Sequence, residues 1–152
     1  TNRVNQSKLN RRQIRIELTE SAMIAKEEAL IGQLNEIHKL GIGIYIDDFG
    51  TGYSSLGRIK NLPIDGIKID RSFIENIEID NGVLQLVKAI CAIAESFHLS
   101  VTVEGVETQA QLAVLKNLYC HQFQGYFFSK PLTEKQMIKH IDEEIKNIVK
   151  IA

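Results

Sequence analysis

The sequence has few cysteines, no excess of one charge and no long apolar run, and each shortage excludes a class of protein. Cys91 and Cys120 form no C-x-x-C pair and are too few for a disulfide framework, so we expect reduced thiols in a cytosolic protein. Lysine and arginine number 18 against 19 aspartates and glutamates, which argues against a DNA, RNA or anionic-lipid surface. No apolar run approaches the roughly 18 residues that span a bilayer, and residues 1–13 are too polar for a signal peptide.

The sequence does contain two periodicities that alternate along the chain. β-Branched residues recur at every second position, the signature of a strand, in four segments: 14–18, 42–47, 64–70 and 101–104. A weaker fifth strand is expected at 121–126. Helical spacing is found between and after them, in 21–40, 54–62, 81–98, 108–118 and 133–149. This alternation predicts an α/β fold in which helices cover a parallel sheet.

Two arrangements of these units remain open, a doubly wound sheet and a TIM-type (β/α) barrel. A complete barrel usually has eight βα units in about 250 residues, whereas this chain of 152 residues has about five. If the fold is a barrel, we therefore expect a partial one whose first strands are missing.

Each of the four clear strands carries a charged residue near its C-terminal end, on the face opposite its branched residues: Glu17, Asp47, Lys68 and Glu104. In a barrel these ends converge on one mouth, so several carboxylates and one lysine would meet there. The alternative is a solvated sheet face, which is common in antiparallel sheets. Because the intervening helices require parallel crossovers, the convergent site is favoured.

Glutamate and aspartate without histidine or cysteine suit hard cations such as Mg²⁺ or Mn²⁺. One carboxylate of the adjacent pair Asp47 and Asp48 could bridge two ions, as in two-metal phosphoester hydrolysis, although such pairs are also common in turns. Lys68 could bind phosphate or hold the attacking water, or it could be a simple counter-ion to Asp70. The glycines at 50 and 52 suggest a mobile loop over the rim.

Five blocks of this sequence resemble the signature blocks of the EAL family, in family order and with similar separations. They are IRIELTES (14–21), DDFGTGYSSL (47–56), IKIDRSFI (67–74), VEGVET (103–108) and QGYFFSKPL (124–132). The resemblance covers about residues 8 to 140 and identifies 1–152 as a single partial EAL domain, the C-terminal portion of the barrel. It implies hydrolysis of cyclic-di-GMP to linear pGpG with Mg²⁺ or Mn²⁺, two ions in the complete domain.

The resemblance also implies roles for individual residues. Glu17, Asp47, Asp48 and Glu104 match metal-binding acids, of which Asp47 and Asp48 bind and bridge the ions. Lys68 matches the lysine that positions or activates the water, and Glu104 also matches an essential catalytic glutamate. Three further residues match supporting or substrate-binding positions: Glu20, which would steady the loop after Asp48, Glu107 and Gln124.

The departure from the family pattern is at the start. The family is named after a Glu-Ala-Leu strand near the start of the domain, and an asparagine ligand follows that strand. Neither occurs before the first block of this sequence. Glu28-Ala29-Leu30 spells the tripeptide inside a helical segment, so we interpret it as a chance match. We therefore expect low activity from this chain alone, and pairing with a second copy along open edges at 14–18 and 121–126.

Two other functions stay in competition with the phosphodiesterase. The chain could be a non-catalytic module that binds cyclic-di-GMP or only a protein partner, or a metal-dependent barrel enzyme acting on another phosphoester. The retained acids favour catalysis, whereas the missing strands favour binding. We expect a bacterial, cytoplasmic location, with any membrane tether supplied by other domains.

Overall fold

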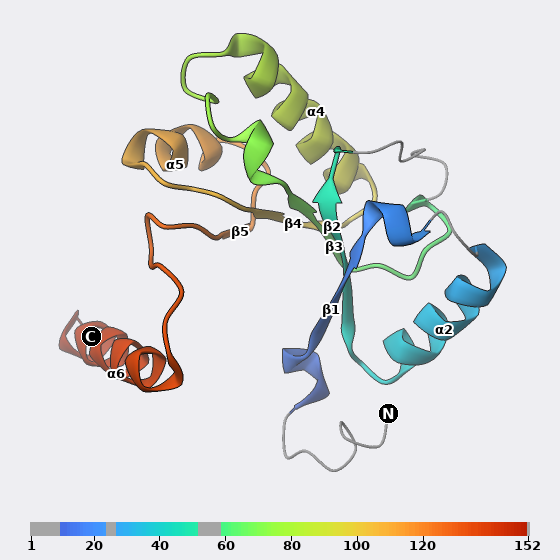
Figure 1. Cartoon of the computed structure of the whole chain (residues 1–152), viewed down its shortest axis with the longest axis horizontal. Helices are drawn as coiled ribbons and strands as arrows, with labels where there is room; N and C mark the ends of the chain where they lie inside the picture. The colour runs from blue at the N-terminus through green and yellow to red at the C-terminus, as the bar shows by residue number, and fades with distance from the viewer. Residues whose placement is uncertain (1–9, 24–26, 52–58, 152) are drawn as a thin grey trace.

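The computed structural model describes residues 10–23, 27–51 and 59–151 and contains one five-stranded parallel sheet (Figure 1). The strands are β1 (Arg15–Thr19), β2 (Gly43–Phe49), β3 (Gly66–Ile69), β4 (Ser100–Val103) and β5 (Gln122–Phe123). They lie side by side in sequence order, and each neighbouring pair is parallel. Consecutive parallel strands joined by helical crossovers are the construction of a (β/α) barrel, so the predicted α/β fold class is confirmed.

Helices lie in the connections between strands and after the last strand. Within the described residues the α-helices are α2 (Glu27–Lys39), α4 (Asn81–Ser96), α5 (Gln109–Leu115) and, after β5, α6 (Glu134–Ile151), and short 3₁₀ turns are η1 (Arg11–Gln13), η2 (Glu20–Met23) and η3 (Arg71–Phe73). Of the helix predicted for 21–40, residues 21–23 belong to η2 instead, and Glu27–Lys39 form α2. Most of the helix predicted for 54–62 lies outside the described residues.

Local chemistry accounts for where these helices begin and end. Asp80 accepts hydrogen bonds from the backbone N–H groups of Gly82 and Val83 at the start of α4. Thr108 and Gln111 form a reciprocal capping box at the start of α5. Gly41 follows α2 with a φ of 79°, the left-handed conformation expected of a glycine that ends a helix.

The hydrophobic core lies between the sheet and its helices. Ile46, Ile67 and Val101, from three neighbouring strands, are at most 1% exposed and pack with Val87 and Ala94 of α4. The opposite, inner face of the same strands carries the charged residues, because side chains alternate along a strand. The fold thus separates an apolar face, which stabilises it, from a polar face, which is available for chemistry.

One irregularity interrupts the register between β2 and β3. Ile46 pairs with Ile67 and Phe49 pairs with Ile69, so two residues of β2 stand opposite the single residue Lys68. This two-against-one count is that of a β-bulge, and the extra residues are Asp47 and Asp48. Asp48 adopts a φ of 54°, which is uncommon for a residue other than glycine.

The last helix stands apart from the sheet, at the end of an extended segment that follows β5 (Figure 1). Met137, Ile138 and Ile141 of α6 are about half exposed. Within the described residues, no helix combines the length and the apolar character that a bilayer crossing requires.

Candidate metal centre

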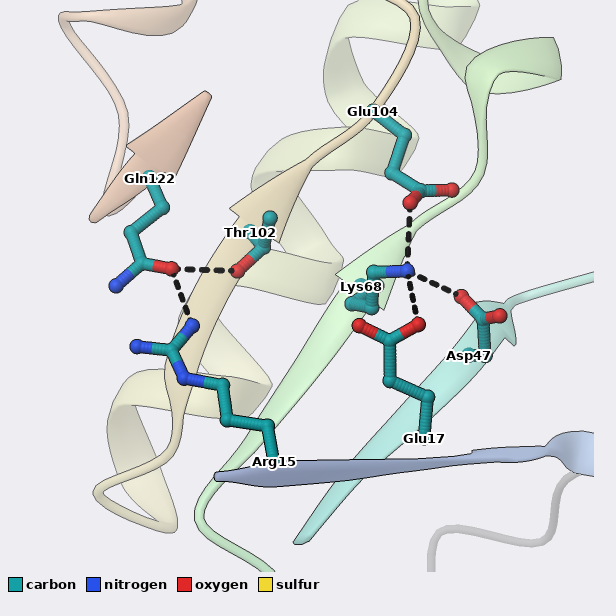
Figure 2. Close-up of polar contacts among 7 residues, drawn as sticks. All are labelled: Arg15, Glu17, Asp47, Lys68, Thr102, Glu104 and Gln122. Atoms are coloured by element: carbon teal, nitrogen blue, oxygen red, sulfur yellow. Dashed lines mark hydrogen bonds and ion pairs between the residues drawn. The ribbon is translucent and has the colours of Figure 1, made fainter. Parts of the chain in front are cut away.

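Lys68 lies at the centre of a group of carboxylates on the inner face of the sheet (Figure 2). Its Nζ is 2.8 Å from Glu17 Oε2, 3.0 Å from Asp47 Oδ1 and 2.6 Å from Glu104 Oε1. These residues come from β1, β2 and the end of β4, and Lys68 itself is on β3. The structure therefore brings together the four charged residues that the strand pattern predicted to converge.

The carboxylates keep Lys68 protonated. Burial alone would lower the pKa of the ammonium group, whose side chain is 8% exposed. The hydrogen bonds to Glu104, Glu17 and Asp47 outweigh that effect and raise the pKa well above its ordinary value. Lys68 is therefore held as a cation in this arrangement, and it donates hydrogen bonds to the carboxylates.

Three carboxylates form a group of the size that a metal ion requires. One oxygen each from Asp47, Asp48 and Glu104 lie within 4.8 Å of one another, and all three residues are half-buried. An all-oxygen donor set of this kind suits a hard divalent cation. Glu17, which was predicted to bind metal, is outside this group; its side chain is 47% exposed and reaches the site through Lys68.

The bulge in β2 explains how two adjacent aspartates reach one place. In a regular strand Asp47 and Asp48 would point to opposite faces of the sheet. The bulge and the positive φ of Asp48 turn its carboxylate toward that of Asp47 instead. Thr51 holds this turn, because its N–H and its hydroxyl both donate to the Asp48 carbonyl, at 3.2 and 2.8 Å.

Glu20 lies beneath the turn that follows Asp48. It is 3% exposed, and its Oε2 accepts a hydrogen bond of 3.3 Å from the backbone N–H of Gly50. This placement is compatible with the role implied for Glu20, which is to steady the segment after Asp48.

The remaining predicted residues line a hollow beside Glu104. Glu107 and Gln124 share this space of about 210 Å³ with Asp70, Arg71 and Tyr126. Arg71 and Tyr126 were not predicted as site residues, although both lie inside the sequence blocks quoted above. A larger hollow of about 310 Å³ lies at the opposite ends of β1 and β2, lined by residues such as Arg12 and His38, and none of the predicted site residues lines it.

The interpretation of Lys68 as a counter-ion to Asp70 is wrong. Among the described residues, Asp70 is not one of the carboxylates within ion-pair distance of Lys68. Its Oδ1 instead accepts a hydrogen bond of 3.0 Å from the backbone N–H of Ser72 and begins η3. Hydrogen bonding from Ser72 outweighs burial and lowers the pKa of Asp70. Strand alternation does not extend to Asp70, because β3 ends at Ile69 and η3 begins directly after Asp70.

Comparisons with known proteins agree with this geometry. A family model described as EAL domain matches residues 1–131. The cyclic di-GMP phosphodiesterase NbdA of Pseudomonas aeruginosa is 44% identical over 119 residues, which are 78% of this chain and 15% of that protein. The chain thus spans less than a fifth of the length of such a relative.

Two solved structures are similar over most of the chain. The PaMucR phosphodiesterase in complex with c-di-GMP superposes with a TM-score of 0.84 at 38% identity, covering 90% of this chain and 55% of that one. The manganese and cyclic-di-GMP complex of BlrP1 from Klebsiella pneumoniae superposes with a TM-score of 0.79 at 30% identity, covering 86% and 33%.

Proposed function

The chain belongs to the EAL domain family, and on that premise we propose that its carboxylate centre hydrolyses one phosphodiester bond of cyclic-di-GMP to give linear pGpG. The observation that carries this proposal is the convergence of Glu17, Asp47 and Glu104 on Lys68, with Asp48 turned into the same space by the bulge. The names of NbdA and of the PaMucR complex support the choice of substrate.

The charge of the centre fits a divalent cation. Glu17, Asp47 and Glu104 contact one ammonium group, and Asp48 adds a fourth carboxylate beside Asp47 and Glu104. Four acids and one lysine leave three negative charges. Asp47, Asp48 and Glu104 would hold Mg²⁺ or Mn²⁺, and the manganese complex of BlrP1 supports Mn²⁺ as the ion. When bound, such an ion polarises the phosphate oxygens and makes a bound water more acidic.

Protonation states assign the other tasks. Because the carboxylates keep Lys68 charged, it would orient the attacking water or a phosphate oxygen by donating a hydrogen bond, and it would not remove a proton. The proton of the attacking water must then pass to a carboxylate. Glu104, whose Oε1 is 2.6 Å from Lys68 Nζ, is in position to accept it. Gln124 and Glu107 would contact the substrate in the adjoining hollow.

The test is metal binding measured beside turnover. Titration calorimetry with Mn²⁺ should detect binding that Asp47→Asn or Asp48→Asn weakens at least tenfold, while Asp142→Asn, an exposed position on α6, leaves it unchanged. Unchanged Mn²⁺ affinity in the first two variants would exclude this centre as the metal site. Formation of pGpG from cyclic-di-GMP, followed by chromatography, then tests the reaction itself.

A non-catalytic module that binds cyclic-di-GMP is the second candidate, and the c-di-GMP complex of PaMucR supports binding of this nucleotide as well. Calorimetry with cyclic-di-GMP in Ca²⁺ separates the two functions. Nucleotide binding without pGpG formation in Mg²⁺ or Mn²⁺ would establish the module, and turnover would exclude it.

The two outer strands support a proposal about assembly. Within the described residues β1 and β5 each pair on one side only, so each has a free row of backbone donors and acceptors. We propose that two copies pair along these edges. Light scattering should then give the mass of a dimer, and a strictly monomeric mass would contradict this.

A further inference from the structure

Two thiols lie in contact on the helix-covered side of the sheet, opposite the carboxylate centre. Cys91 of α4 is 3% exposed and belongs to the hydrophobic core, and Cys120, in the segment between α5 and β5, is half-buried and packs against it. Their sulfur atoms are 3.7 Å apart although the residues are 29 positions apart in sequence. The proposed hydrolysis uses neither residue.

The backbone around Cys120 fixes the approach of its sulfur to α4. The Cys120 N–H donates to the Leu118 carbonyl at 2.8 Å, and the next residue, His121, donates to the Val101 carbonyl of β4 at 2.9 Å. Cys91 lies on the buried side of α4, within the hydrophobic core. Packing of α4 and the backbone hydrogen bonds around Cys120 therefore both maintain the contact between the sulfurs. A disulfide requires a sulfur–sulfur distance of about 2.05 Å, so bond formation would draw the two segments slightly closer.

The contact also makes the pair easier to ionise. Either thiol can donate a hydrogen bond to the other sulfur. Donation from Cys120 stabilises the Cys91 thiolate and lowers the pKa of Cys91, despite its burial. Loss of the second proton is opposed, because the first thiolate and burial both raise the pKa of Cys120. The contact thus favours loss of the first proton, and the remaining proton can reside on either sulfur because either can be the donor.

We propose that Cys91 and Cys120 form a redox-active dithiol that hydrogen peroxide converts into an intramolecular disulfide. Peroxide reaches the more accessible Cys120 first. The Cys120 sulfur passes its proton to Cys91 through their hydrogen bond and attacks one peroxide oxygen. The O–O bond breaks, Cys120 becomes a sulfenic acid, and the hydroxide that leaves takes up a proton to become one water. The Cys91 sulfur then attacks the Cys120 sulfur, the S–O bond breaks, and a second water leaves. Two thiols lose two electrons, and one peroxide becomes two waters.

The disulfide would join α4 covalently to the segment that leads into β5. This strand is two residues long, Gln122–Phe123, and Gln124 of the candidate site follows it directly. Oxidation would therefore fasten the last strand of the sheet without touching the carboxylate centre. Its effect is expected first on stability, and this expectation holds whether or not the chain hydrolyses cyclic-di-GMP.

Peroxide treatment of the purified chain tests the proposal. We expect the intact mass to fall by two hydrogen atoms, both thiols to become unreactive toward a thiol reagent, and a proteolytic peptide containing Cys91 linked to Cys120 to appear. Thermal denaturation should show Tm raised by roughly 5–10 °C, with full reversal by dithiothreitol. Cys120→Ser keeps the buried Cys91 and should show neither the mass loss nor the reversible rise in Tm.

Three results would overturn the proposal. The first is a mass gain of whole oxygen atoms without any cross-link, and the second is a disulfide only between separate chains on a non-reducing gel. The third is retention of both free thiols at peroxide concentrations that oxidise a cysteine placed on the exposed surface of α6 by Lys139→Cys in a Cys91→Ala, Cys120→Ser background.

Discussion

Arg15 on β1 donates a hydrogen bond of 2.6 Å from its guanidinium group to the side-chain oxygen of Gln122 on β5, which joins the two outermost strands across the inner face of the sheet (Figure 2). In a flat sheet these strands would stand about 19 Å apart, four spacings of about 4.8 Å, too far for the two side chains to meet. The contact therefore shows that the sheet is strongly curled, as the wall of a barrel must be.

A double-mutant cycle measures this contact. Arg15→Ala, Gln122→Ala and the double variant should show a coupling free energy of about 0.5–1 kcal/mol in urea unfolding, modest because both side chains are exposed. Arg15 also lies over the ring of Tyr45, 4.7 Å from its centroid, so Arg15→Ala should cost more than Gln122→Ala. A coupling near zero would mean that the edges do not meet in solution.

Replacing the central lysine should lower the stability of the metal-free protein and raise its affinity for metal. Lys68→Met leaves Glu17, Asp47 and Glu104 without their shared cation, and we expect a loss of about 1–3 kcal/mol, less than for a fully buried pair because the carboxylates are partly exposed. Mn²⁺ should then raise Tm by more in this variant than in the parent, because no ammonium group competes for the oxygens. Lys60→Met, at an exposed position, is the matched control, and equal metal-induced shifts in all three proteins would contradict the prediction.

Gly125 is required by the close approach of two backbone segments. A Cβ at this position would overlap the backbone of Val106, which also exchanges hydrogen bonds with Gln124 and Phe127. Gly125→Ala should therefore destabilise the protein by about 2–4 kcal/mol in urea unfolding. Gly32→Ala is the control, since nothing lies within 4 Å of the added carbon in α2, and it should stabilise by about 0.5–1 kcal/mol. Similar effects at the two positions would show that the Val106 contact is looser than described.

The capping carboxylate of η3 predicts a pH dependence. Hydrogen bonding from Ser72 holds the pKa of Asp70 below its ordinary value, so the folded pKa lies below the unfolded one. Asp70 therefore stabilises the fold at every pH above its unfolded pKa, and this contribution disappears as pH falls through the folded value. Asp70→Asn should be less stable than the parent at pH 7, with a difference that shrinks below about pH 4. A constant difference in urea unfolding from pH 7 down to pH 3 would exclude this origin.

The strands and the meeting of their charged residues could be predicted because both follow from alternation. Glu17, Asp47 and Lys68 lie opposite branched residues of known parity, and parallel crossovers place all strand ends on one side. The segment Glu28-Ala29-Leu30 was correctly placed in a helix, since α2 spans it. These predictions needed only the period of each segment.

Features that depend on backbone detail or on packing could not be predicted. The bulge at Asp47 and Asp48 breaks the strand period of two, so the sequence indicates an adjacent pair of acids without giving its geometry. Asp70 was predicted as the last residue of a strand but begins the turn η3. The alternation of residue types does not show at which residue the pairing of two strands ends. The contact between Cys91 and Cys120 joins segments whose separation depends on how α4 packs against β4.

The bulge has a consequence for shortened versions of this strand. Deleting Asp48 would leave Ile46, Asp47 and Phe49 in unbroken alternation opposite Ile67, Lys68 and Ile69, and Phe49 would keep the core side that it occupies now. Such a chain is expected to fold with an intact interior and one acid fewer. The extra residue of β2 therefore supplies an acid to the candidate metal centre and is not needed for the core. A relative one residue shorter here is expected to keep the architecture and to lose one of these acids.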